Sequence, residues 1–189
     1  MAGGRSARMR GRDKLLERID GESLIRRAAS EAARSVASAV VVVVGHDHGR
    51  RMAELSGLDV EIVATELAAE GMAGSIRAGI AHLGDDCDGA MLILPDMPCV
   101  GAEEINAIAS QSGADEIVRA TSGDGTPGHP VYFPRKYFPD LIGLTGDSGA
   151  RPVLSRYSEN VRYIRLPGNK AVLDLDTPED WEAWIDRRR

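Results

Sequence analysis

The sequence predicts an α/β fold: a single domain over residues 1–189, built as a three-layer α/β/α, Rossmann-like arrangement around a mostly parallel sheet. Apolar, β-branched runs alternate with stretches of helical periodicity, as expected of repeated strand–helix units. The strongest runs lack the polar alternation of half-exposed strands, which is typical of parallel sheets covered on both faces. The length of 189 residues suffices for one full core, and no linker-like stretch divides the chain.

The strands are predicted from their apolar runs. The strongest are Ala39–Val44, with the sequence AVVVVV, and Ala90–Leu94, which ends at Pro95. Shorter or weaker candidates show the same enrichment in β-branched and aromatic residues. They are Val60–Ala64, Ile117–Thr121, Val131–Phe133, Val161–Leu166 and Val172–Leu175.

Four helices are predicted between the strands, because apolar residues recur there at steps of three and four. In the last of them, Trp181 and Trp184 are interpreted as core anchors rather than as a ligand platform. The predicted helices are Glu22–Ser38, Ser75–Leu83, Glu103–Ser110 and Pro178–Asp186.

Composition narrows the class of protein. The net charge of −6 disfavours general nucleic-acid binding, and interleaved aromatic residues are missing from the basic N-terminal stretch. No apolar run approaches the roughly 20 residues that span a membrane, and no signal peptide is visible. Cys87 and Cys99 have no CxxC spacing, so two unpaired thiols in a reducing cytoplasm are expected, without a structural zinc site.

In open α/β sheets ligands bind beyond the carboxyl ends of the strands, which directs attention to the loops there. The segment Ala2–Lys14 is rich in glycine and basic residues, whose amides, guanidinium forks and ammonium group suit a triphosphate. It is neither a Walker A loop nor a GxGxxG motif, and a solvated tail is the alternative. Its basic residues are Arg5, Arg8, Arg10, Arg12 and Lys14.

Two acidic motifs lie at predicted strand ends. Asp96 follows Ala90–Leu94 within LPDMP, where a carboxylate is a natural Mg²⁺ ligand and a simple turn is the alternative. Asp174 and Asp176 would point to the same side of a strand. Thr177 and Pro178 are interpreted as the N-cap and first residue of the last helix. That structural role does not explain the two aspartates, whereas a metal ion does.

Five motifs together resemble the MobA-like NTP transferases, and among them most closely the molybdenum cofactor cytidylyltransferases. The resemblance covers nearly the whole chain, and its specificity lies in the order of the motifs. It implies a nucleotidyltransferase fold and in-line attack of an acceptor phosphate on the α-phosphorus of an NTP, with Mg²⁺ and release of pyrophosphate. The motifs are AGGRSARM followed by DK, GMAGSIRAGI, LPDMP, GHPVYFPRKYFPDLIGLTGDSGARPVL and DLDTPEDW.

The resemblance also implies residue roles. Arg8, Lys14 and Asp96 would be catalytic, and Asp96 and Asp176 would bind Mg²⁺. His129 would lie toward the acceptor pocket, although a lone loop histidine is otherwise more often incidental. The residues expected to bind the nucleotide are Ala2, Gly3, Gly4, Ser6, Arg8, Lys14, Met72, Gly74 and Ser75.

Departures from the family pattern concern the N-terminus. Family members begin with a buried strand that leads into the glycine-rich loop, and here Met1 stands where that strand would end. We therefore expect a short apolar segment encoded upstream of Met1. The AGG tripeptide and the ten-residue step from Gly4 to Lys14 resemble the guanylyl-transferring branch, and Arg10 replaces a usual glycine. The later motifs favour CTP, so CTP is expected and GTP stays open.

The acceptor implied by the resemblance is molybdopterin carrying molybdenum, and the partner a molybdenum hydroxylase or its chaperone. Related transferases use other small phosphates, so the sequence leaves the acceptor open. A non-catalytic nucleotide-binding or cofactor-chaperone protein on the same fold is the rival. Lys14, Asp96 and Asp176 argue against that rival, and the absent first strand argues for it.

Overall fold

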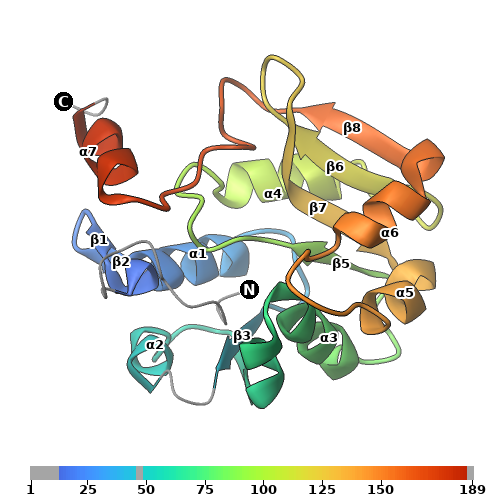
Figure 1. Ribbon diagram of the computed structural model, residues 1–189, viewed down its shortest axis with the longest axis horizontal. Coiled ribbons are helices and arrows are strands. Elements are labelled where there is room, and N and C mark those ends of the chain that lie inside the picture. Colours follow the sequence, from blue (N-terminus) through green and yellow to red (C-terminus); the bar gives the residue numbers. More distant parts are fainter. Residues whose placement is uncertain (1–12, 46–48, 187–189) are drawn as a thin grey trace.

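The computed structural model describes residues 13–45 and 49–186, and these form the predicted α/β fold (Figure 1). Each strand and helix below was predicted from the sequence, with ends that shift by up to five residues. The strands are β3 (Val41–Gly45), β4 (Glu61–Thr65), β5 (Gly89–Leu92), β6 (Ile117–Thr121), β7 (Pro127–Pro134) and β8 (Val161–Arg165). The helices are α1 (Leu24–Ala33), α3 (Met72–His82), α4 (Ala102–Ala109) and α7 (Pro178–Asp186).

A β-hairpin precedes α1, whereas the sequence predicts no element before Glu22 and a helix from Glu22 onward. Asp20 and Gly21 have φ of 54° and 85°, which turns the chain sharply between β1 (Arg18–Ile19) and β2 (Glu22–Ser23). Ser23 then caps α1, because its side chain accepts a hydrogen bond from the amide of Arg26 at 3.4 Å. Helix α1 accordingly begins at Leu24 rather than at Glu22.

Other short elements also escape the sequence prediction. They are α2 (Gly49–Glu54), α5 (Phe138–Ile142), α6 (Arg151–Arg156) and the 3₁₀ turns η1 (Lys14–Leu16), η2 (Glu66–Glu70), η3 (Arg135–Tyr137) and η4 (Ser158–Asn160).

The strands pair in both directions. The larger sheet has the order β5–β7–β6–β8, in which β6 and β8 are parallel and β7 is antiparallel to both of its neighbours. Strands β3 and β4 form a separate parallel pair. The predicted parallel arrangement therefore holds for β3–β4 and β6–β8, while β7 makes the larger sheet mixed.

The predicted strand Val172–Leu175 is wrong. Its backbone is held by turns, since the amides of Val172 and Leu173 both donate to the carbonyl of Asn169 at 3.0 and 2.9 Å. The amide of Leu175 donates to the carbonyl of Asp96 at 3.0 Å. These bonds leave no ladder for a strand, and they draw the segment toward the loop after β5.

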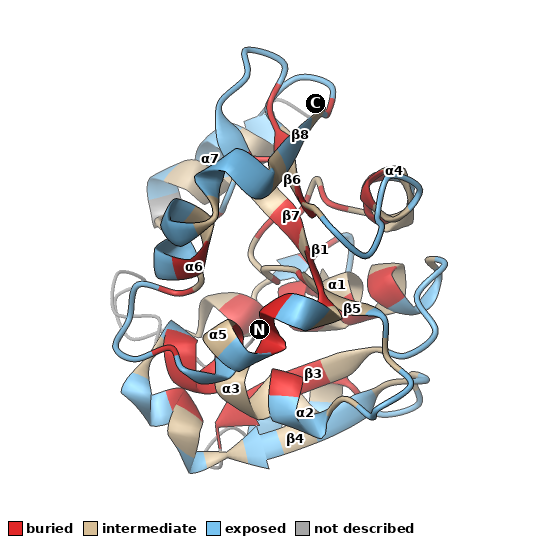
Figure 2. Cartoon of the chain, turned by 90° about the vertical axis from the view of Figure 1, so that its right-hand side faces the viewer, coloured by how far each residue is buried: buried red, intermediate tan, exposed pale blue. Residues whose placement is uncertain are grey.

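Helices cover both faces of the sheet, which gives the three predicted layers. Helices α3, α5 and α6 pack on one face through residues such as Ile76, Leu141 and Val153. Helices α1 and α4 lie on the other side, where Ile108 packs against Val118 and Ala120 of β6. Figure 2 shows buried residues along β3, β6 and β7 and on parts of the helices that cover them.

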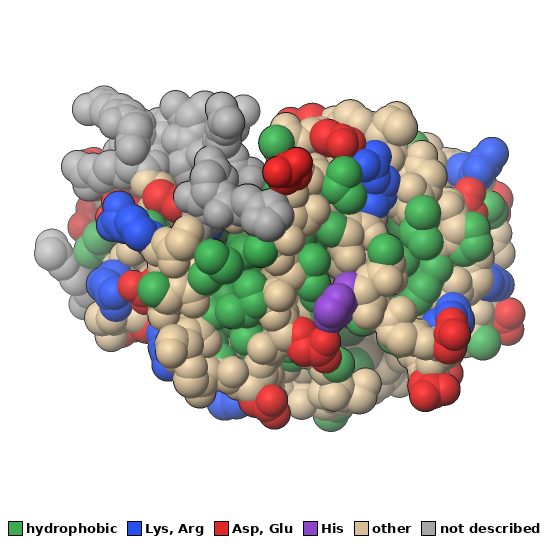
Figure 3. Space-filling view, turned by 90° about the horizontal axis from the view of Figure 1, so that it is seen from below, with side chains coloured by type: hydrophobic (Ala, Val, Ile, Leu, Met, Phe, Trp, Pro, Cys, Tyr) green, Lys and Arg blue, Asp and Glu red, His purple; other side chains and the backbone are tan. Residues whose placement is uncertain are grey.

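Helix α7 closes the end of the molecule near β1 and β2 (Figure 1). Trp181 and Trp184 pack against Ile19, Leu24 and Leu175, in the core role predicted for them. Among the described residues, no helix is long and apolar enough to cross a membrane. Figure 3 shows one face of the molecule, on which hydrophobic side chains gather while acidic and basic side chains are scattered around them.

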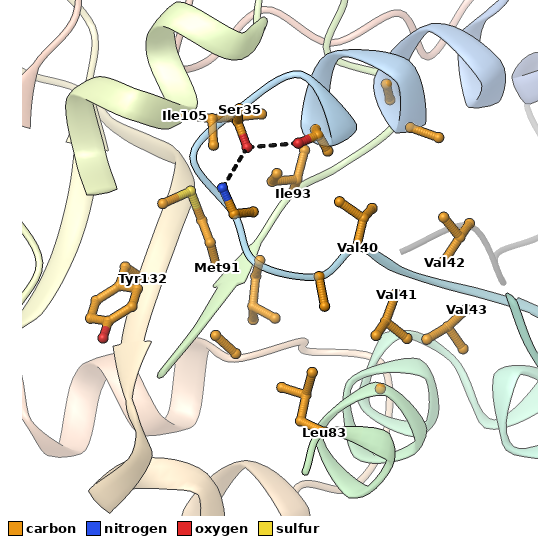
Figure 4. Close-up of a pocket in the computed structure, with 18 of the residues that line it drawn as sticks. Ser35, Val40, Val41, Val42, Val43, Leu83, Met91, Ile93, Ile105 and Tyr132 are labelled. Atoms are coloured by element: carbon orange, nitrogen blue, oxygen red, sulfur yellow. Dashed lines mark hydrogen bonds between the residues drawn. The ribbon is translucent and has the colours of Figure 1, made fainter. Parts of the chain in front are cut away.

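An apolar slot separates the two sheets. Within the described residues no ladder joins β3 to β5, and a cavity of about 280 Å³ lies between them. Met91, Ile93 and Ile105 line it on one side and Val41 and Val43 on the other (Figure 4). The segment from α1 to β3 is held against the end of α1 by the hydroxyl of Ser35, which donates to the carbonyl of Ala32 at 2.6 Å.

Candidate active site

A cleft of about 820 Å³ lies at the ends of the strands of the larger sheet, on the side where β5 and β6 terminate. Its walls come from η1, the start of α3, the loop after β5, strands β6 and β7, and the loops that precede α6 and α7. The charged and imidazole side chains that line it are Lys14, Asp96, Arg119, His129, Asp147, Arg151, Asp174 and Asp176.

Lys14 binds two carboxylates from distant parts of the chain. Its ammonium group lies 2.5 Å from Asp96 Oδ2 and 2.5 Å from Asp176 Oδ1. All three side chains are largely buried. Burial disfavours the charged lysine, but the two carboxylates outweigh it and raise the pKa of Lys14 above its ordinary value. The three residues predicted from sequence to meet phosphate and metal therefore lie together.

The carboxylate of Asp96 is only half satisfied. Its Oδ2 receives Lys14, whereas Oδ1 is buried and has no hydrogen-bond partner among the described residues. An unpaired buried carboxylate oxygen is costly, and a bound cation would satisfy it. Asp96 and Asp176 thus fit a divalent cation, since Mg²⁺ commonly takes one or two carboxylates and completes its shell with phosphate and water.

Asp174 adds negative charge beside this pair. Although its side chain is exposed, partial desolvation and then the charges of Asp176 and Asp96 raise its pKa from the ordinary value. Within the described residues there is no preformed cluster of three or more His, Cys, Asp or Glu side chains around a common point. The cation would accordingly depend on substrate phosphates for the rest of its ligands.

A buried ion pair positions Lys14. Asp13 receives two hydrogen bonds from Arg51, from Nε at 2.7 Å and from Nη2 at 2.8 Å. Arg51 is only 1% exposed. Asp13 also accepts the amide of Leu15 at 3.1 Å, which caps the η1 turn that carries Lys14. The position of the lysine is therefore set from α2, an element that the sequence did not predict.

His129 lies in the cleft wall on β7. Its Nδ1 is 3.4 Å from the carbonyl of Leu92, and its amide donates to the carbonyl of Ala171 at 2.8 Å. Burial, with a smaller contribution from the charge of Arg119, lowers the pKa of His129 to about 4. The imidazole is therefore neutral at pH 7 and can offer one donor and one acceptor.

The burial of His129 predicts a pH dependence of stability. An unfolded histidine takes up a proton near pH 6.5, and the folded one only near pH 4. Between these values the unfolded state binds more protons, so stability falls as the pH falls, by about 2–3 kcal/mol at most. Urea unfolding from pH 7 to pH 4 should show a shallower decline for His129→Asn than for wild type. The exposed His82 provides the matched control, and an identical slope for His129→Asn and His82→Asn would contradict the assignment.

The start of α3 brings one of its three predicted nucleotide residues to the cleft. Met72 lines the cleft, as expected of a residue beside the nucleotide. Gly74 instead packs against η2, where an added Cβ would lie 1.7 Å from the carbonyl oxygen of Leu67. Ser75 is 2% exposed and faces the apolar slot. Neither Gly74 nor Ser75 lines the cleft in this structure, because the packing of α3 on η2 and β3 turns them away.

The remaining predicted nucleotide ligands lie outside the described residues. They are Ala2, Gly3, Gly4, Ser6 and Arg8, which precede the first described residue, Asp13.

Sequence reasoning missed two arginines of the cleft. Arg119 comes from the middle of β6 and Arg151 from the first position of α6. The signal for Arg119 was available, because an arginine inside the apolar run IVRAT needs a polar surrounding. For Arg151 the sequence offered no comparable signal, since α6 itself was not predicted.

Comparison with known proteins matches the chain to one family and to relatives that cover nearly its whole length. A family model described as MobA-like NTP transferase domain matches residues 1–161. The purine catabolism protein PucB of Bacillus subtilis is 27% identical over 195 residues, covering 96% of this chain and 92% of PucB. Rv0371c from Mycobacterium tuberculosis is 26% identical, with a TM-score of 0.86 over 98% of this chain and 94% of its own. The nucleotidyl transferase Mth528 of Methanothermobacter shares the fold, with a TM-score of 0.81 at 21% identity over 98% and 94% of the two chains.

Proposed function

The chain belongs to the MobA-like NTP transferase domain family, a family of nucleotidyltransferases, and from this membership we propose that it transfers a nucleoside monophosphate from an NTP to a small phosphorylated acceptor, with Mg²⁺ as cofactor. The observation that carries the proposal is the meeting of Lys14, Asp96 and Asp176 in one cleft. Two carboxylates can bind the cation that accompanies a triphosphate, and an ammonium group can neutralise charge on its phosphates.

Each side chain has a role in this reaction. The acceptor phosphate attacks the α-phosphorus in line, the bond to the bridging oxygen breaks, and pyrophosphate leaves with that electron pair. Asp96 and Asp176 would hold Mg²⁺, which neutralises phosphate charge when bound. Lys14 would then be released from the two carboxylates and would bind the departing phosphates. Because the Nδ1–H of neutral His129 faces the carbonyl of Leu92, its Nε2 would accept a hydrogen bond from the acceptor, without bringing a further charge into the cleft.

We infer CTP as the preferred nucleotide, because the motifs GMAGSIRAGI and GHPVYF support it over the AGG tripeptide. A ligand that binds only the folded state at 100 times its Kd stabilises it by about 2.7 kcal/mol. For a chain of this length that is a rise in Tm on the order of 5–10 °C. Thermal unfolding with CTP and Mg²⁺ should show this rise, with a smaller one for GTP. A rise with GTP alone would reverse the preference.

We infer molybdopterin carrying molybdenum as the acceptor, on the strength of the same motifs, and a molybdenum hydroxylase or its chaperone as the recipient. The direct test is release of pyrophosphate from CTP in the presence of this pterin phosphate, with each of Mg²⁺ and Mn²⁺. Mn²⁺ is included because Rv0371c has been crystallised in complex with manganese. Nucleotide binding without any pyrophosphate release would instead identify a non-catalytic nucleotide-binding protein.

A further inference from the structure

Arg119 and Arg151 place two positive charges in the same cleft. Arg119 projects from β6, where it pairs in register with Val131 of β7 and Tyr163 of β8. Arg151 begins α6. Both arginines line the same cleft, and burial above all, with a contribution from the charge of Arg151, lowers the pKa of Arg119. Two like charges in one pocket repel, and an anion between them removes that penalty.

Neither arginine has a carboxylate partner among the described residues. The one hydrogen bond of the Arg119 side chain runs from Nε to the carbonyl of Gly128 at 3.1 Å, and the guanidinium of Arg151 has no hydrogen bond or ion pair with a described residue. The contrast with Lys14 is sharp, since that ammonium group already binds Asp96 and Asp176. Among the residues that the structure describes, the cleft therefore combines a lysine paired with two carboxylates and two guanidinium groups without a carboxylate partner.

The loop before α6 is built to hold Arg151 at the cleft. Asp147 Oδ1 accepts the amide of Met72 at 2.9 Å, which fixes this loop to the start of α3. Gly149 has φ of 59°, and an added Cβ would lie 2.5 Å from the sulfur of Met72. These contacts fix the backbone that leads into Arg151, whose exposed side chain lines the cleft.

We propose that Arg119 and Arg151 form an anion subsite that binds the phosphate group of the acceptor. Guanidinium groups bind phosphate oxygens through paired N–H donors, which suits a phosphomonoester better than a neutral hydroxyl compound. His129 lines the same cleft as both arginines and Asp96, so the subsite and the proposed cation site belong to one cleft. This inference rests on the proposed function and adds which residues select the acceptor.

The test uses the full chain saturated with CTP and Mg²⁺, and phenyl phosphate as a simple phosphomonoester probe. Calorimetric titration of the probe should give weak binding to wild type and at least tenfold weaker binding to Arg119→Gln and Arg151→Gln. CTP affinity should stay within twofold in both variants. The matched control is Arg162→Gln, because Arg162 lies on β8, the strand beside β6, but pairs with Glu116 and does not line the cleft.

The outcomes separate this inference from the proposed function. Equal probe binding by wild type, Arg119→Gln and Arg151→Gln, while CTP still binds, would overturn the subsite and leave the nucleotidyltransferase proposal standing. A loss of CTP binding equal to the loss of probe binding would also overturn it, since the arginines would then serve the nucleotide. Failure of wild type to bind CTP at all would contradict the proposed function itself.

Discussion

Asp96→Asn should lower kcat of nucleotidyl transfer by on the order of a thousandfold while leaving the fold intact. The substitution keeps the size of the side chain but removes the charge that would hold the cation, and a metal contact of this kind contributes several kcal/mol to transition-state stabilisation. Oδ1 of Asp96 is buried and has no hydrogen-bond partner among the described residues. No described side chain is therefore in place to take over the role of the cation in the variant. Steady-state kinetics at increasing Mg²⁺ concentration is the measurement.

The control for this variant is Asp86→Asn, which removes an exposed carboxylate from the loop before β5, outside the cleft. Its kinetics should equal those of wild type. Near-normal turnover by a folded Asp96→Asn protein would show that Asp96 does not hold the cation, and that its pairing with Lys14 is structural.

Arg51→Met should destabilise the protein by about 3–5 kcal/mol, the usual cost of breaking one side of a buried ion pair. Methionine fills much of the same volume, but it leaves the carboxylate of Asp13 without its two guanidinium hydrogen bonds. Against a typical net stability of about 5–15 kcal/mol, this is a large fraction. Urea denaturation with wild type in parallel measures the change.

Arg50→Met offers a close comparison, since Arg50 is the exposed neighbour on the same helix. We expect a change within about 0.5 kcal/mol there, as for most surface substitutions. If the two variants unfold at the same urea concentration, the Asp13–Arg51 pair contributes little and the η1 turn must be held by other contacts.

Much of the fold was predictable because the buried face of a strand or helix imposes a regular spacing of apolar residues on the sequence. The bounds of β6 were predicted as Ile117–Thr121 and those of α7 as Pro178–Asp186, as observed. The misses have local causes. Val172–Leu175 alternates like a strand, but its amides bond to Asn169 and Asp96 instead of to a neighbouring strand. The hairpin before α1 could have been found from its Asp-Gly turn, whereas α5 and α6 are too short to show a helical period.

The candidate site was predicted mainly from the family resemblance, because, of its three central residues, only Asp96 also follows an observed strand. Lys14, Asp96 and Asp176 are separated by 82 and 80 residues, counting from 14 to 96 and from 96 to 176, and no local pattern would unite them. The buried Arg51 could not be predicted, because a lone arginine in a polar segment resembles any solvated one. Likewise, the turn of Ser75 toward the slot depends on how α3 packs against η2, which is a tertiary effect.

The apolar slot has a consequence for the cooperativity of the molecule. Among the described strands β3 pairs only with β4, and β5 only with β7. Every second backbone amide of such an edge strand points away from its partner strand. The amides of β3 and β5 that point into the slot therefore have no hydrogen bond to a described strand to slow their exchange. In the described part of the chain no ladder joins the β3–β4 pair to the larger sheet, and side chains such as Val40 and Met91 belong to one apolar cluster across the slot. Hydrogen exchange would therefore divide the amides into two groups, with β3 and β4 opening at a lower free energy than β6 and β7.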